Sequence, residues 1–77
     1  GDIRSAAPGA AERRASPGEP VYREGGDTVA AGDVVGRVEV MKSFIEVKAE
    51  TAGTITAFKV ENEEPITAGA VIAELDS

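Results

Sequence analysis

Lys42 is the residue whose position in the sequence best fits a chemical role. The chain has 77 residues and contains neither cysteine nor histidine. Disulfides, thiolate chemistry and the commonest metal ligand and general base are therefore excluded, which argues against a stand-alone catalytic centre. A lysine offers a primary amine that can be modified covalently when it is exposed. The elements around Lys42 decide whether it is.

Alternating apolar and polar residues lie on both sides of Met41-Lys42. Val38 and Val40 precede the pair, and Ile45 and Val47 follow it. This alternation predicts a β-hairpin with Met41-Lys42 at its tip. Two-residue hairpin turns favour Asn-Gly, Asp-Gly or Gly-X, because their central residues take positive φ. The tip conflicts with this local preference, as functional sites do, so we expect Lys42 to be displayed for modification.

The composition excludes several other classes of protein. It is 42% hydrophobic and 29% charged, which is typical of one small globular domain that buries about 60% of its unfolded surface. A net charge of −6 argues against a nucleic-acid partner. No apolar run is long enough to span a membrane, and no apolar signal region begins the chain, so we expect a cytoplasmic protein without a membrane partner.

Short strand-like segments separated by turn signals make up most of the chain. They cover residues 34–40, 54–60 and 71–75, with a polar connector at 61–65. No segment has helical periodicity, so the pattern predicts an all-β sandwich or barrel.

The N-terminal part is less strand-like, with Ile3 as the only large apolar residue before residue 16. We expect residues 1–5 to be an N-terminal linker or remnant and residues 6–77 to form the folded domain. Residues 15–22 are rich in proline and predict a loop.

An internal repeat divides the chain into two similar halves. Residues 29–35 match residues 66–72 at a constant offset (66 − 29 = 37). Residues 8–11 match residues 52–55 at an offset of 44, so the first half carries an insertion near residues 15–22. The repeat therefore predicts two similar sets of strands, each of which buries one face against the other.

The repeat also reveals an anomaly in the first half. Ala10-Ala11-Glu12 stand where the second half has Thr54-Ile55-Thr56. Replacing a large buried side chain by alanine typically costs about 2–5 kcal/mol. Either residues 8–13 do not form a core strand, or that first strand has been weakened.

The segment Glu39-Val40-Met41-Lys42 resembles the biotin-attachment motif Glu-Ala-Met-Lys-Met of biotin carboxyl carrier proteins and other biotinyl domains. The resemblance extends from about Ala6 to Asp76. The other matching segments are Gly26-Asp27-x-Val29, Ala31-Gly32-Asp33, Glu46-Val47-x-Ala49 and Ala52-Gly53-Thr54-Ile55.

The resemblance implies a flattened all-β barrel or sandwich of two four-stranded antiparallel sheets related by pseudo-twofold symmetry. It implies that biotin–protein ligase joins biotin to Lys42 through an amide bond. Glu39, Val40 and Met41 are then the residues that the ligase recognises. No catalytic residue and no metal site are expected.

The resemblance also implies a carrier function. The chain is then a non-catalytic carrier of a biotin-dependent carboxylase that shuttles carboxybiotin between biotin carboxylase and carboxyltransferase. The loop with Ser16, Pro17 and Tyr22 stands where the carrier of bacterial acetyl-CoA carboxylase has a protruding "thumb". Acetyl-CoA carboxylase, in fatty-acid synthesis, is therefore the expected enzyme.

Some positions depart from the family pattern. Val40 and Ser43 replace the usual Ala and Met beside Met41-Lys42 and are mild changes. Ala11-Glu12 stand where the family has an aromatic pair, and Arg37 stands where it has an apolar residue. This loss of apolar bulk indicates an engineered or degenerate variant, with a first strand that is weakened.

Alternative functions follow from the same residues. A lipoyl carrier has the same fold, but usually Asp-Lys-Ala at its tip. An unmodified or engineered structural or assembly module would explain the weak first strand better than it explains the motif. Phe44 and Phe58 are expected to be packing residues without a ligand role.

Overall fold

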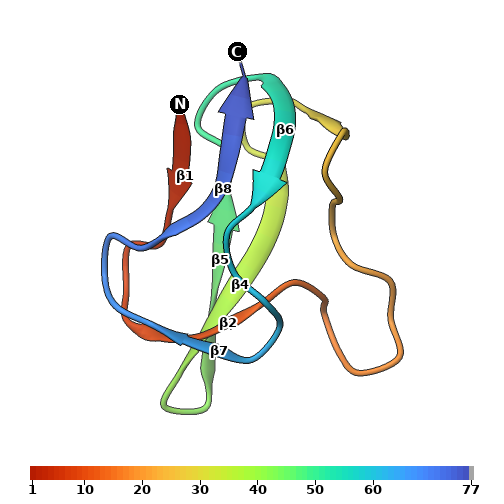
Figure 1. Ribbon diagram of the computed structural model, residues 1–77. Coiled ribbons are helices and arrows are strands. Elements are labelled where there is room, and N and C mark those ends of the chain that lie inside the picture. The colour runs from red at the N-terminus through yellow and green to blue at the C-terminus, as the bar shows by residue number, and fades with distance from the viewer. Residues whose placement is uncertain (77) are drawn as a thin grey trace.

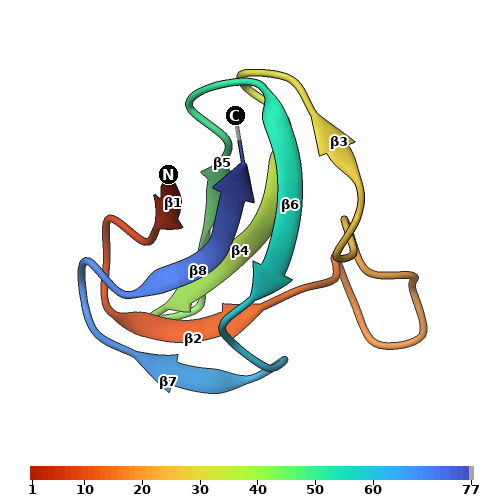
Figure 2. The same ribbon diagram turned by 45° about the horizontal axis from the view of Figure 1, so that its top comes forward.

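The computed structural model describes residues 1–76. Eight strands fold into a flattened barrel without a helix in the described part of the chain (Figures 1 and 2). The strands are β1 (Asp2–Arg4), β2 (Gly9–Glu12), β3 (Thr28–Val29), β4 (Val34–Val40), β5 (Ser43–Lys48), β6 (Gly53–Phe58), β7 (Glu64–Ile66) and β8 (Val71–Asp76). The predicted all-β fold is therefore confirmed.

The strands form two four-stranded antiparallel sheets. One sheet has the order β1-β8-β6-β3, and the other has the order β5-β4-β2-β7. The predicted repeat relates the two sheets. A shift of 44 residues takes β1 to β5 and β2 to β6, and a shift of 37 residues takes β3 to β7 and β4 to β8. The two halves thus have the same strand order, as pseudo-twofold symmetry requires.

Two glycines at equivalent positions show how closely the halves correspond. A Cβ atom at Gly53 would lie 2.7 Å from the carbonyl oxygen of Asp76, and one at Gly9 would collide with the carbonyl oxygen of Glu39. Both strands β6 and β2 therefore need glycine where they approach β8 and β4. These equivalent strands of the two halves thus begin in the same way.

The core lies between the sheets and is built mainly from small and β-branched side chains. Its largest fully buried members are Ile55, Val35 and Val38. Ala11 is also buried, in the central strand β2 of its sheet. Residues 8–13 therefore do contribute a core strand, and the alternative that they do not is wrong.

The N-terminal segment corrects a second prediction. Residues 1–5 were expected to be a linker or remnant, but Asp2–Arg4 form β1, which pairs with β8. Ile3 is only 5% exposed, because its side chain belongs to the core. The predicted domain boundary at residue 77 lies outside the described residues. The polar connector predicted at residues 61–65 also overlaps strand β7.

Candidate functional site

The predicted hairpin is present and is formed by β4 and β5. Its register runs from Arg37 opposite Glu46 to Val40 opposite Ser43, which leaves Met41 and Lys42 as the two central turn residues. Their φ angles are 51° and 69°. Positive φ at both positions is the signature of a type I′ turn, which fits the right-handed twist of the strands. The strand pairing thus imposes on Met41 and Lys42 a conformation that their side chains disfavour.

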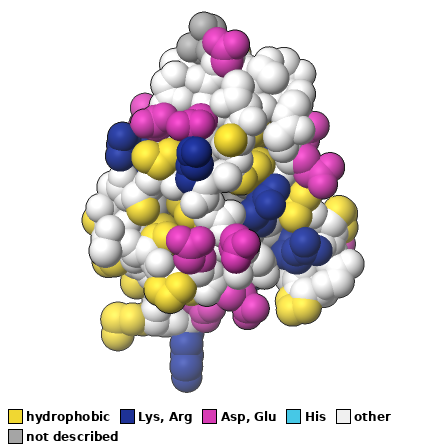
Figure 3. Space-filling model, in the orientation of Figure 1, with side chains coloured by type: hydrophobic (Ala, Val, Ile, Leu, Met, Phe, Trp, Pro, Cys, Tyr) yellow, Lys and Arg dark blue, Asp and Glu magenta, His cyan; other side chains and the backbone are white. Residues whose placement is uncertain are grey.

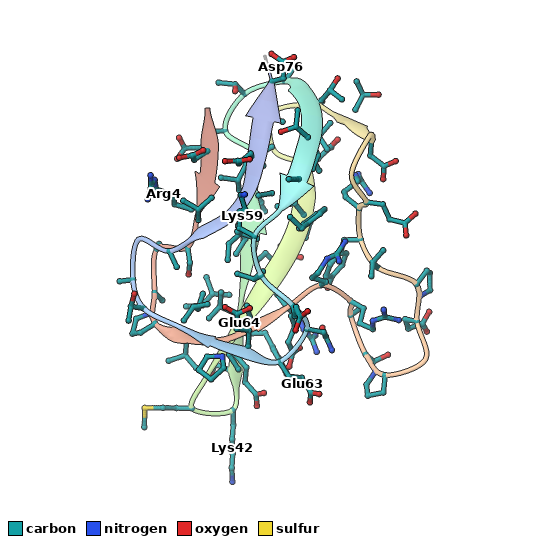
Figure 4. The ribbon with its side chains drawn as sticks, in the orientation of Figure 1. Arg4, Lys42, Lys59, Glu63, Glu64 and Asp76 are labelled. Carbon is teal, nitrogen blue, oxygen red and sulfur yellow. The ribbon has the colours of Figure 1, made fainter. Side chains whose placement is uncertain are left out.

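Lys42 stands clear of the barrel. Its side chain points into solvent at the end of the molecule opposite Asp76, the last residue of β8 (Figure 4). Among the ion pairs found within residues 1–76, none includes Lys42. Met41 beside it is 93% exposed. A second protein can therefore reach the amine without any rearrangement of this chain, and amide formation at Nζ meets no steric obstacle.

The three residues expected to be read by a ligase differ in accessibility. Glu39 and Val40 are partly buried at the end of β4, and Val40 packs against the core. Only Met41 projects freely. Acidic and hydrophobic side chains gather on the surface just above the protruding lysine (Figure 3). Recognition of these residues by a ligase stays a prediction.

The insertion predicted at residues 15–22 is a loop that protrudes beside the barrel (Figure 1). A bridge between Arg14 and Val21 closes its base, where the N–H of Tyr22 donates to the carbonyl of Arg13 over 2.8 Å. The Arg13 guanidinium also lies 4.0 Å from the centroid of the Phe58 ring. Ser16 and Pro17 are exposed at the tip, whereas Tyr22 is half-buried.

A cluster on the outer face of sheet β5-β4-β2-β7 was missed from the sequence. The Nε of Arg37 donates to Oε1 of Glu12 over 2.7 Å, and the same guanidinium lies 3.7 Å from the centroid of the Phe44 ring. Phe44, predicted to be a packing residue, is 49% exposed because it lies on the outer face of the edge strand β5. The sequence contained one signal for this cluster: Glu12 and Arg37, which both depart from the family pattern, have opposite charges.

Comparison with known proteins identifies the family. The model of the family described as "Biotin-requiring enzyme" matches residues 1–75. The chain belongs to this family. The predicted resemblance to biotinyl domains is therefore confirmed, and it covers β1 as well as the other strands.

Relatives of this biotin-requiring family are similar over most of the chain. The biotin carboxyl carrier protein of acetyl-CoA carboxylase from Pseudomonas aeruginosa is 39% identical over 64 residues, which cover 83% of this chain and 41% of that protein. The protein of the same name from Streptococcus pyogenes is 41% identical over 70 residues, covering 90% and 42%. The chain thus spans about two fifths of the length of these relatives.

A solved structure supports the fold. The Kluyveromyces lactis urea carboxylase superposes on 99% of this chain with a TM-score of 0.80 and 28% sequence identity, although the match covers only 6% of that protein. Within residues 1–76, no helix is long and apolar enough to cross a membrane. The same residues contain no group of three His, Cys, Asp or Glu side chains arranged to hold a metal ion.

Proposed function

We propose that this chain is the carrier domain of a biotin-dependent acetyl-CoA carboxylase, with biotin bound covalently to Nζ of Lys42. The observation that carries the proposal is the placement of Lys42. In a chain of the biotin-requiring family, this lysine occupies a protruding two-residue turn and points away from the barrel (Figure 4). The relatives that match most of the chain are named as carrier proteins of acetyl-CoA carboxylase, which supports the choice of this enzyme.

The residues present fit the cofactor. Biotin binds to proteins through an amide, which needs an accessible amine and no enclosing pocket on the carrier. Lys42 is exposed, and the neighbouring Met41 and Ser43 are exposed as well. When attached, biotin supplies the carboxyl-carrying chemistry, so the chain itself needs no catalytic group.

The barrel contributes position and reach. The turn lies at the end of the barrel opposite strand β1 and the end of β8 (Figures 1 and 4). A tethered carrier visits separate active sites at a raised local concentration. The proposed sites are those of biotin carboxylase and carboxyltransferase, and biotin–protein ligase attaches the cofactor.

Two further roles belong to this proposal. Glu39, Val40 and Met41 take part in recognition by the ligase, which fits their position at or beside the tip. The loop with Ser16, Pro17 and Tyr22 acts as the thumb of an acetyl-CoA carboxylase carrier. Its closure by the Arg14–Val21 bridge supports a loop of defined position.

Intact mass after exposure to a ligase tests the proposed function. The chain is incubated with a bacterial biotin–protein ligase, biotin and ATP. We expect one biotinyl increment on the unsubstituted chain and on Lys48→Arg, a matched control on the same hairpin, but none on Lys42→Arg. Addition by a lipoyl ligase instead would indicate a lipoyl carrier. A folded sample that gains no mass with either ligase would contradict the carrier function and favour an unmodified structural module.

A further inference from the structure

Exposed apolar side chains are concentrated around Lys42. Within residues 1–76, the large hydrophobic residues that are exposed are Met41, Phe44 and Ile45, at 93%, 49% and 43%. All three lie in the turn or in the first half of β5. Ile45 lies opposite the buried Val38, on the inner face of the sheet, so Met41 and Phe44 form the exposed apolar surface beside Lys42 that another protein can cover.

Phe44 differs from its neighbours because its ring is held in place. The Arg37 guanidinium stacks on it at 3.7 Å from the centroid, and Glu12 fixes that guanidinium through a 2.7 Å hydrogen bond. The Arg37 and Glu12 side chains are only 18% and 15% exposed. The three side chains link β5, β4 and β2 on the face opposite the buried Val38 and Ala11. A ring fixed in this way loses little conformational entropy when a partner binds it.

The charges around Phe44 specify the partner's surface. Glu39 is its direct cross-strand neighbour, and Glu46 lies two residues along the same face of β5. Neither residue is paired with Arg37 in an ion pair found within residues 1–76, where Arg37 binds Glu12 and Glu46 lies 3.8 Å from Lys48. Arg37 is balanced by Glu12 and Glu46 by Lys48, so Glu39 is the carboxylate beside the ring without an ion pair found among the described residues. A ring next to this carboxylate fits an apolar pocket with a Lys or Arg side chain at its rim.

We propose that Phe44, held by Arg37 and Glu12, is the anchor by which biotin–protein ligase binds this chain. The inference rests on the proposed function. The ligase must bind the chain before any biotin is attached, so its affinity has to come from the carrier's own side chains near Lys42. The carboxylase active sites, in contrast, can bind the attached cofactor itself. A rigid aromatic residue is the commonest source of such concentrated binding energy.

Steady-state biotinylation with a bacterial biotin–protein ligase, biotin and ATP tests the anchor. We expect Phe44→Ala to raise the KM for the chain about tenfold or more with kcat unchanged, because binding is lost while the amine stays in place. Arg37→Met, which frees the ring, should raise KM about two- to fivefold. Ile45→Ala is the matched control, since it truncates an exposed apolar residue on the opposite face of β5, and its KM should stay within about twofold.

A second measurement separates binding from folding. Lys42→Arg cannot be biotinylated, so it acts as a competitive inhibitor, and adding Phe44→Ala to it should weaken inhibition by the same factor as the rise in KM. Thermal unfolding of each variant confirms that it is folded. An unchanged KM for Phe44→Ala, or an equal rise for Ile45→Ala, would overturn the anchor while the carrier function stands. Failure to biotinylate the unsubstituted chain would overturn both.

Discussion

The Met41-Lys42 turn is predicted to reduce the stability of the fold. Both residues have positive φ, at 51° and 69°. For a residue with a side chain, this conformation costs roughly 1–2 kcal/mol. Asn-Gly is the preferred pair for such a turn. The glycine, however, lowers stability by about 0.4–1 kcal/mol, because it increases the conformational entropy of the unfolded chain. Substituting both residues by Asn-Gly should therefore stabilise the domain by about 1–2 kcal/mol.

Thermal unfolding followed by circular dichroism measures this gain. A domain of this size shifts by about 4–8 °C per kcal/mol, so Met41→Asn with Lys42→Gly should raise Tm by about 4–16 °C, and Met41→Asn alone by a smaller amount. Gly26→Ala is the control of opposite sign. Its φ is 96° and no atom lies within 4 Å of the added Cβ, so only backbone strain should lower its Tm.

An unchanged or lower Tm for the Asn-Gly variant would refute the strain argument. The turn would then conflict with no local preference, and the first reason for regarding Lys42 as functional would be lost. A raised Tm, together with loss of biotinylation, would show that the chain keeps a less stable turn because the lysine is needed there.

Two other predictions concern positions revealed by the internal repeat and by the outer face of the sheet. Glu63 has φ 67° where the first half has Gly26, so Glu63→Gly should raise the free energy of unfolding in urea by up to about 1 kcal/mol, and a loss would contradict the comparison of the two halves. A double-mutant cycle with Glu12→Gln and Arg37→Gln should give a coupling energy of about 1 kcal/mol, whereas additive effects would show that the pair does not stabilise the fold.

Local patterns in the sequence predicted most of the architecture. Alternation around Met41-Lys42 was sufficient for the hairpin, because its strands are adjacent in sequence and their register is fixed by the turn. The offsets of 37 and 44 residues predicted two equivalent halves. The strands that were missed or misjudged have only two or three residues each: Asp2–Arg4, Thr28–Val29 and Glu64–Ile66. Their stability comes from pairing with distant strands, and Pro65 in Glu64–Ile66 hides the strand pattern further.

The candidate site was predictable only in part for the same reason. The position of Lys42 follows from the hairpin, but the contacts of Arg37 do not, since Glu12 lies 25 residues away in sequence. In the sequence, Glu12 and Arg37 indicate only a loss of apolar bulk relative to the family pattern. The structure places the two residues directly opposite each other in β2 and β4. The strand register thus brings Glu12 and Arg37 together, and two residues that are each unfavourable in the family pattern form one hydrogen-bonded ion pair.

This pairing changes what the anomalous first strand implies. Ala11 and Ile55 occupy equivalent positions in the two halves and are both fully buried, so the core holds a smaller side chain in β2 than in β6. On the outer face, however, Glu12 joins β2 to Arg37 and through it to Phe44 on the hairpin that displays Lys42. The two charges lie in register, and the Phe44 ring stacks on one of them, Arg37. Strand β2, which has less apolar bulk than β6 inside the barrel, thus carries on its outer face a polar link to the hairpin with the proposed site.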